Sequence, residues 1–265
     1  RVRRVIKGQF AQAGLSFTFW LSLAMNAVDT DVAAGQFGMF FLRAEQPHGY
    51  VVLHPTYPFV VASPDAPAVK GSDFNRVVAQ VAHVLTSTRT SLEQRGQAIS
   101  VLDGVKTQAA TMALREAANE SDVTLQLQAV AALLRRNDIS VLPIAESALL
   151  YPPQNIEPHI LTRLASTLQG IENPQAIPSL ARLLMANDIE TRRSAAIALR
   201  KTDAREAIEP LARALEDSAR EVRYQAVLGL AMITRKGKWA TSSSLYERDE
   251  QRYLTYWKEW VRNRQ

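Results

Sequence analysis

The stretch DIETRRSAAIALRKTDAREAIEPLARALEDSAREVRYQAVLGL, residues 188–230, decides the fold because its second half repeats its first. The segments RRSAAIALRK and RYQAVLGLAM align at an interval of 31 residues. In this alignment they share an alanine (Ala195, Ala226) and a leucine (Leu199, Leu230). Self-similarity at such a period is typical of stacked repeats. The sequence therefore predicts an α-solenoid built from pairs of helices.

The same register extends toward the N-terminus of the chain. Segments that begin at residues 95, 126 and 161 align with the first two, and the successive intervals are 31, 35, 31 and 31 residues. The leucine column contains Leu102, Leu133, Leu168, Leu199 and Leu230, and the alanine column contains Ala98, Ala129, Ala195 and Ala226. Small residues beside leucines let helices approach closely, and stacking buries the apolar side that each pair exposes. We predict about five repeats over residues 74–235.

Partner helices are predicted between these segments. AIPSLARLL (residues 176–184) and AIEPLARAL (residues 207–215) match at the same interval of 31 residues, and VLPIAESALL from Val141 is a looser copy. Each contains a proline near its start, where the missing N–H costs little because the first helical turn leaves its amides unpaired. Each repeat is therefore expected to be a helix pair.

The first 62 residues follow a different pattern. In GLSFTFWLSL, apolar and hydroxyl residues alternate, which indicates a half-buried strand. Similar short runs are RVRRVI, FGMFFLR, YVVLH and FVVA. We predict a small antiparallel β-barrel or sandwich in residues 1–62, and SPDAPAVKGSD (residues 63–73) as a linker. The fold class expected for the chain is α+β with several domains.

Two resemblances to known families accompany these patterns. Residues 188–230, and with them the whole of residues 74–235, resemble HEAT repeats, in particular the short bacterial variety called phycobilisome-lyase-type HEAT-like repeats. RVRRVIKG and, after a spacer, GQFGMFFLR resemble the netrin-type or OB-like barrel of bacterial surface and secreted proteins. Those barrels begin with a further strand and often contain cysteines, and neither is seen here. The resemblance thus implies a barrel that is incomplete unless residues precede Arg1 or a partner supplies a strand.

Composition narrows the classes of function. The chain contains no cysteine, so disulfides and thiolate metal sites are excluded. Its net charge is +5, but residues 1–7 and residues 235–265 each carry +4, so the residues between them sum to −3. A nucleic-acid-binding groove in the repeats is therefore disfavoured, although the basic ends could contact an anionic surface. The most apolar stretch, residues 15–28, is too short to span a bilayer as a helix.

Chemistry-bearing residues give little sign of catalysis. His48 and His54 flank one predicted strand, and six residues along a strand separate them by roughly 20 Å, too far for one metal ion. No nucleophile elbow, P-loop, dinucleotide or zinc-protease motif is found. We expect no enzyme activity, no cofactor and no metal.

One position of the repeat is basic in three of the five units, at Arg95, Arg192 and Arg223. It could contact an acidic partner, but the other two units place Gln126 and Leu161 there. We favour ion pairs within the repeats. The nearby acidic candidates are Asp122, Asp188, Glu190 and Glu221.

The C-terminal stretch RYLTYWKEWVRNRQ is rich in aromatic and basic residues. It could be a platform for stacked bases or a helix that caps the last repeat. On a helix its apolar residues form one wide face: Tyr253, Leu254, Tyr256, Trp257, Trp260 and Val261. We favour the cap, because a terminal repeat must bury that side and present a polar exterior. Residues 236–251 are expected to be the loop that lets the cap fold back, and the cap domain spans residues 236–265.

The predicted function is a non-catalytic scaffold for protein–protein interaction, or an accessory subunit of a larger bacterial assembly. The expected contact residues lie mainly in the loop YPPQNIEPH: Tyr151, Pro152, Pro153, Gln154, Asn155, His159, Arg193 and Tyr224. One alternative is a lyase-like or chromophore-handling accessory protein, which a bound chromophore would support. A second is a nucleic-acid-binding HEAT protein, which steep salt dependence would support. The expected location is the bacterial envelope, the periplasm or the secreted fraction, with the cytoplasm as the alternative.

Overall fold

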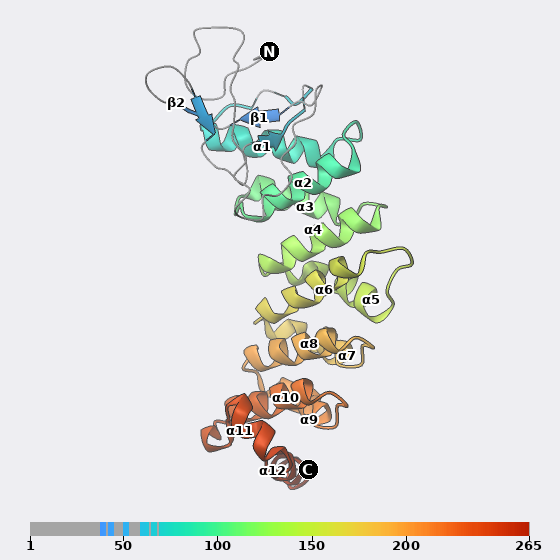
Figure 1. Cartoon of the computed structure of the whole chain (residues 1–265), viewed down its shortest axis with the longest axis vertical. Coiled ribbons are helices and arrows are strands. Elements are labelled where there is room, and N and C mark those ends of the chain that lie inside the picture. The colour runs from blue at the N-terminus through green and yellow to red at the C-terminus, as the bar shows by residue number, and fades with distance from the viewer. Residues whose placement is uncertain are drawn as a thin grey trace. The chain divides into compact units, whose positions relative to one another are not determined.

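The computed structural model describes residues 38–40, 42–44, 50–52, 59–63, 65–67 and 69–264 (Figure 1). The chain divides into two compact units, residues 1–117 and residues 118–265. Most described residues of both units are helical, as the repeat pattern predicts. No described helix is both long enough and apolar enough to cross a membrane. The predicted domain limits at residues 62, 73 and 235 stay a prediction.

Short strands occur in three of the predicted runs of the first unit. β1 (Gly38–Phe40) pairs antiparallel with β4 (Phe59–Val61), and Met39 is opposite Val60. β2 (Leu42–Ala44) pairs in the same sense with β3 (Tyr50–Val52). The runs RVRRVI and GLSFTFWLSL lie outside the described residues. The described part thus contains two two-stranded sheets, and a barrel over residues 1–62 stays a prediction.

Three helices complete the first unit: α1 (Asp73–Thr86), α2 (Leu92–Asp103) and α3 (Gln108–Ala117). They pack against one another. Ser72 caps α1 by accepting a hydrogen bond from the Asn75 amide, at the end of the predicted linker. Ser91 and Gln94 cap α2 reciprocally, which satisfies two amides that the first turn leaves open. The helical part therefore begins where the composition changes.

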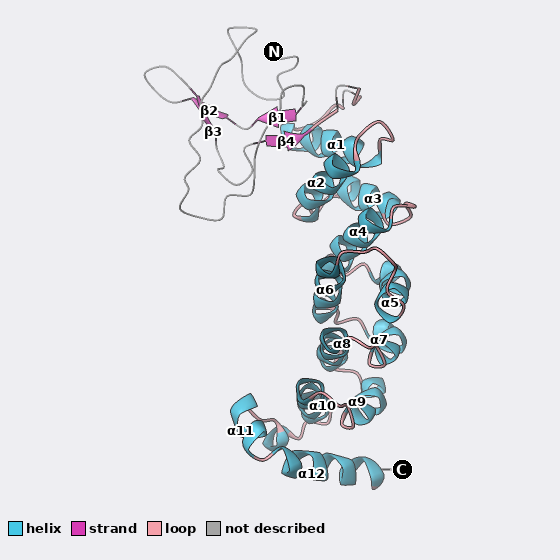
Figure 2. Cartoon of the chain, turned by 45° about the vertical axis from the view of Figure 1, so that its right-hand side comes forward, coloured by secondary structure: helices cyan, strands magenta, loops and turns pink. Residues whose placement is uncertain are grey.

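The second unit contains two rows of helices that alternate along the chain (Figure 2). One row consists of α4 (Val123–Arg135), α6 (Pro158–Thr167), α8 (Ile189–Lys201) and α10 (Arg220–Ile233). The other consists of α5 (Leu142–Leu150), α7 (Ile177–Leu183) and α9 (Ile208–Ala214). Helices of one row contact their neighbours in that row and in the other row. This arrangement is the predicted solenoid of helix pairs.

The two aligned columns form the core of the helices that carry them. The five repeated segments lie in α2, α4, α6, α8 and α10, and α6 continues into a 3₁₀ turn (Leu168–Gly170). The leucines of one column and the alanines of the other are completely buried: Leu102, Leu133, Leu168, Leu199, Leu230, Ala98, Ala129, Ala195 and Ala226 are each 0% exposed. The aligned leucines and alanines are thus core residues of their helices.

The three helices of the second row, α5, α7 and α9, start in the same way. A 3₁₀ turn precedes each of these helices, at Ile139–Val141, Pro174–Ala176 and Arg205–Ala207. Pro143 and Pro178 then lie in the first turn of α5 and α7, as predicted. Proline suits this position because its fixed φ is already helical and its missing N–H has no partner to lose.

The C-terminal region corrects one expectation. Residues 236–251 are not simply a loop, because they include a 3₁₀ turn (Gly237–Trp239) and the helix α11 (Ser243–Arg248). Ser242 caps α11 and Tyr246 is buried. The last helix, α12 (Glu250–Arg262), packs on α9 and α10 and fully buries Trp257. Of the six residues of the predicted cap face, Leu254 and Trp257 are buried and Tyr253, Tyr256, Trp260 and Val261 are half-buried. Their role as a cap stays a prediction, and α11 packs beside α12.

Candidate partner-binding surfaces

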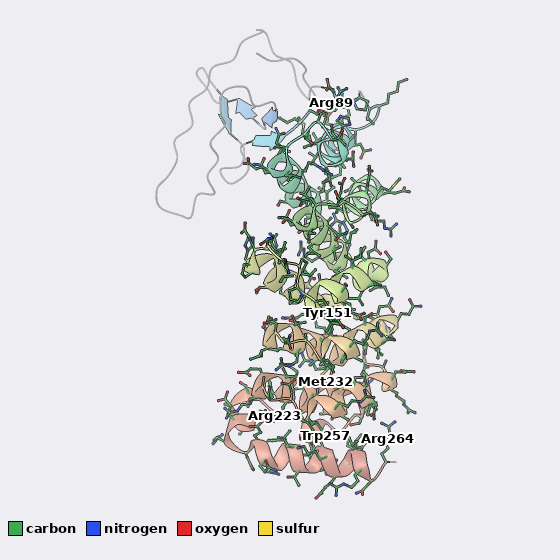
Figure 3. The ribbon with its side chains drawn as sticks, turned by 90° about the vertical axis from the view of Figure 1, so that its right-hand side faces the viewer. Arg89, Tyr151, Arg223, Met232, Trp257 and Arg264 are labelled. Atoms are coloured by element: carbon green, nitrogen blue, oxygen red, sulfur yellow. The ribbon has the colours of Figure 1, made fainter. Side chains whose placement is uncertain are left out.

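The proline-rich extension forms the loop between α5 and α6 (Figure 1). Tyr151 follows the last residue of α5 at the start of this loop, is 78% exposed and is labelled in Figure 3. Asn155 has a φ of 63°, so the chain turns there through the left-handed region. Pro152, Gln154, Asn155 and His159 are exposed and Pro153 is half-buried. The His159 ring lies 3.1 Å from the Glu157 carboxylate, both in solvent. The predicted loop residues are thus accessible.

The next loop of the same row exposes a second large apolar side chain. The 35-residue step that relates Pro143 to Pro178 also relates Leu150, beside Tyr151, to Met185. Met185 is 80% exposed, and Ile189 at the start of α8 is also exposed. Because α5 contacts α7 and α6 contacts α8, these residues lie one repeat apart along one edge. We call Tyr151, Met185 and Ile189 the loop edge.

The loop edge ends at the last repeat. Glu216 follows Met185 by 31 residues, and its carboxylate lies 2.8 Å from the ammonium of Lys258 on α12. The equivalent place in the last repeat is therefore charged and linked to the cap. Of the three loops that follow α5, α7 and α9, the first two therefore expose a large apolar side chain, Tyr151 and Met185, and the third does not. Leu92 and Val123, at the start of α2 and α4, are exposed at the position equivalent to Ile189.

The basic column has a structural role inside the repeats. Nη1 of Arg192 donates to the carbonyl oxygens of Ala186 and Asn187, both at 3.0 Å. Arg223 repeats this geometry with the carbonyl oxygens of Asp217 and Ser218, at 2.7 and 2.9 Å. Each arginine therefore holds the loop that precedes its own helix, and buried carbonyl oxygens need such donors.

Gln126 and Arg95 act similarly, whereas Leu161, in the remaining unit, has no side-chain donor. Nε2 of Gln126 donates to the carbonyl oxygens of Ala118 and Glu120, at 3.2 and 3.4 Å. Nε of the buried Arg95 donates to the Leu85 carbonyl oxygen at 2.7 Å. Glutamine can replace arginine here because both side chains present N–H donors. A partner-binding stripe is thus not the reason for this column.

The predicted carboxylate partners of the column are wrong. Arg192 binds Asp217 with two hydrogen bonds of 2.8 and 3.0 Å, and Arg223 binds Glu250 at 2.7 Å. Both carboxylates come from the element that follows in the stack. The nearer acidic residues have other roles: Asp122 and Asp188 cap α4 and α8, and Glu190 pairs with Arg193, while Glu221 lies in the first turn of α10. N-capping and helical spacing use these groups locally.

Glu250 collects three donors at the start of α12. Besides Arg223, the Tyr246 hydroxyl donates to it at 2.9 Å, and Arg220 lies 3.4 Å away. Burial raises the pKa of Glu250, but the hydrogen bonds from Arg223 and Tyr246 outweigh burial and hold this pKa below its ordinary value. Burial also raises the pKa of the Tyr246 phenol, and the hydrogen bond to Glu250 adds to this. The cap is therefore fixed to the last repeat by a charged network.

Two predicted contact residues are engaged within the chain. Nη2 and Nε of Arg193 bind the Glu190 carboxylate at 2.7 and 2.9 Å. The Tyr224 hydroxyl donates to the Thr241 carbonyl oxygen at 3.0 Å, and its ring lies 5.2 Å from that of Tyr246. Tyr224 thus contacts the cap, and a role of either residue in partner binding stays a prediction.

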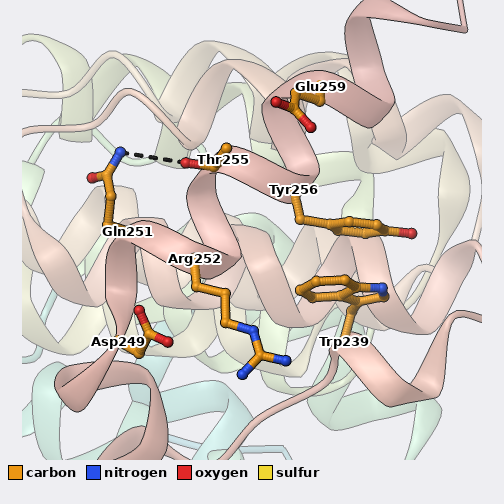
Figure 4. Close-up of a pocket in the computed structure, with 7 residues that line it drawn as sticks. All are labelled: Trp239, Asp249, Gln251, Arg252, Thr255, Tyr256 and Glu259. Carbon is orange, nitrogen blue, oxygen red and sulfur yellow. Dashed lines mark hydrogen bonds between the residues drawn. The ribbon is translucent and has the colours of Figure 1, made fainter.

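A pocket of about 440 Å³ lies beside the cap (Figure 4). Its lining comes from the Gly237–Trp239 turn and from α12: Trp239, Asp249, Gln251, Arg252, Thr255, Tyr256 and Glu259. The Trp239 and Tyr256 rings stack at 3.5 Å with an interplanar angle of 12°. This pocket was not expected from the sequence, in which Trp239 falls within a predicted loop. The described residues contain no group of three or more side chains placed to hold a metal ion.

Comparison with known proteins supports the repeat assignment. The family model for HEAT repeats matches residues 157–231. Among solved structures, the complex of CpcE and CpcF of phycocyanin lyase from Nostoc sp. PCC7120 is similar over 67% of this chain and 72% of that chain, with 20% identity and a TM-score of 0.47. Human deoxyhypusine hydroxylase in complex with glycerol is similar over 71% of this chain and 73% of that chain, with 16% identity and a TM-score of 0.32. No curated protein matches the chain. Residues 157–231 thus match the HEAT-repeat family model, and the completely buried columns of their helices agree with this match.

Proposed function

We propose that the chain is a non-catalytic scaffold subunit that binds a protein partner through the loop edge. The observation that carries this proposal is the exposure of Tyr151 and Met185, 78% and 80%, on successive loops of one row. Tyrosine is enriched among the residues that dominate binding energy, and methionine adapts to varied apolar surfaces.

The HEAT fold supports the same function through rigidity. The two loops end on α6 and α8, whose residues in the two columns are completely buried, and the Arg192 side chain holds the loop after α7 by the carbonyl groups of that loop. Side chains presented from such a fixed edge lose little further conformational freedom on binding, which favours affinity. The partner would then be recognised by an apolar contact across two repeats.

The proposal is tested by isolating a tagged chain from its native source and quantifying what is bound to it. We expect a stoichiometric protein companion whose affinity for Tyr151→Ala falls about 30-fold, the change expected for a binding hot spot of about 2 kcal/mol. Met112→Ala is the matched control, because Met112 is also exposed but lies on α3. Equal affinity of the companion for both variants would contradict the proposal.

A further inference from the structure

The pocket beside α12 contains two carboxylates that the rest of the described chain leaves unused. Asp249 is the N-cap residue of α12, but its side chain makes no capping hydrogen bond. Glu259 is exposed and forms no ion pair with any residue that the structure describes. Three other lining residues lie three, four and seven positions after Arg252: Thr255, Tyr256 and Glu259. At these helical spacings the four side chains share one face of α12 (Figure 4).

The stacked rings of Trp239 and Tyr256 form an aromatic wall on another side of this pocket. Tyr256 covers one face of the Trp239 ring, and the Arg252 guanidinium lies 5.7 Å from the centre of the same ring. This distance is within the range of about 6 Å over which a cation is attracted to an aromatic face. The chain therefore already places one guanidinium against the wall.

We propose that this pocket binds an arginine side chain of a partner protein. Its planar guanidinium would stack on the Trp239–Tyr256 wall and pair with Glu259, a combination that a lysine ammonium matches less well. The chain carries a net charge of +5, so its long-range field repels a cationic ligand. Binding must then come from the local contacts of the pocket. The pocket differs from the loop edge, so either proposal can fail without the other.

The test uses the full chain and two peptide probes. One is acetyl-Gly-Arg-Gly-Arg-Gly-amide, and the other replaces both arginines by citrulline, which keeps the shape and removes the charge. Binding is followed by NMR through the Trp239 indole N–H, which is assigned with Trp239→Phe. We expect the arginine peptide to shift this signal saturably and the citrulline peptide to leave it in place. Equal responses to both peptides, or no response to either, would overturn the proposal.

Two substitutions should change the affinity in opposite directions. Glu259→Gln should weaken binding of the arginine peptide about three- to fivefold, the size expected for an exposed ion pair. Glu247→Gln is the matched control, because Glu247 is an exposed carboxylate of α11 outside the pocket. Arg252→Ala should tighten binding, since it removes the resident guanidinium and a like charge. Unchanged affinity in Glu259→Gln, or unchanged or weaker affinity in Arg252→Ala, would overturn the proposed geometry.

Discussion

A single carboxylate, that of Asp217, joins two consecutive repeats. It binds Arg192 of α8 with two hydrogen bonds and accepts a third, of 2.8 Å, from the Ala219 amide at the start of α10. The side chains of Arg192 and Asp217 are 11% and 8% exposed. Burial raises the pKa of Asp217, but the hydrogen bonds from Arg192 and Ala219 outweigh it and hold this pKa below its ordinary value. The charged form is therefore the one that the fold stabilises.

Asp217→Asn should lower the free energy of unfolding by about 2 kcal/mol, because it leaves the largely buried Arg192 guanidinium without its counter-charge. Urea unfolding followed by far-UV circular dichroism measures this loss. Glu209→Gln is the control, since its partner Arg213 and Glu209 itself are 74% and 60% exposed and such surface pairs contribute little. Similar losses in the two variants would contradict the assigned role of Asp217.

The same carboxylate predicts a dependence of stability on pH. Because the folded-state pKa of Asp217 lies below its ordinary value of 3.8, the unfolded chain takes up the proton first on acidification. The contribution of Asp217 is thus complete above about pH 4 and is lost as the pH falls through the folded-state pKa. The stability difference between the wild type and Asp217→Asn should shrink in acid. A difference that stays constant in the same titration would exclude this linkage.

At the scale of elements, one glycine sets how closely α10 approaches its neighbours. A Cβ atom at Gly229 would lie 2.7 Å from Cδ1 of Leu211 on α9 and 3.3 Å from Cβ of Arg200 on α8. Leu211 is completely buried, so its side chain has little space to move. Glycine lowers the stability of α10 as a helix, but its missing side chain allows α10 to pack closely on α8 and α9.

Gly229→Val should lower the free energy of unfolding by about 2 kcal/mol, because the three carbons of the added isopropyl group overpack the contact with Leu211. Gly104→Ala serves as the control: Gly104 has a φ of −75°, and its Cβ would meet only the Val101 carbonyl oxygen, at 3.9 Å. That change should leave stability unchanged or raise it slightly. Unfolding midpoints in urea compare the two, and an unaffected Gly229→Val variant would contradict the close-packing argument.

An element was predictable from the sequence where its residues recur at the repeat period. The helices of the stack were predictable, because a leucine such as Leu199 has a counterpart one period away and both must be buried. α11 was not, because its six residues have no counterpart and Tyr246 is buried only where α11 meets α10 and α12. The partner of Arg192 was missed for a similar reason. Proximity in sequence favoured Asp188, whereas stacking brought Asp217 into place.

At the scale of the whole molecule, the two candidate surfaces differ in how far sequence could find them. The loop of Tyr151 was predictable, because an insertion into a regular repeat has no place in the core and must lie outside it. The pocket was not, because its wall forms only when Trp239 meets Tyr256 from a different element. Sequence periodicity locates sites made by departures from the repeat, but not sites made by the meeting of two non-repeated segments.

The cap should stabilise the repeats beside it more than distant ones. In a repeat stack each element contacts only its neighbours, so stability is approximately a sum of local terms. Trp257 is completely buried where α12 packs on α9 and α10, and its indole N–H has no hydrogen-bond partner among the described residues, so apolar packing alone holds it. Trp257→Ala should therefore remove about 3–5 kcal/mol of packing from the end of the stack.

Hydrogen exchange followed by mass spectrometry shows where that loss falls. In Trp257→Ala, amides of α9 and α10 should exchange faster, while those of α4 and α5 should keep their rates, because α12 contacts only the former among these helices. Trp260→Ala is the control, since Trp260 is half-buried on the same helix and should produce a smaller change. Equal acceleration from α4 to α10 would mean that the second unit opens as one cooperative body, and the cap would then stabilise every repeat rather than the last.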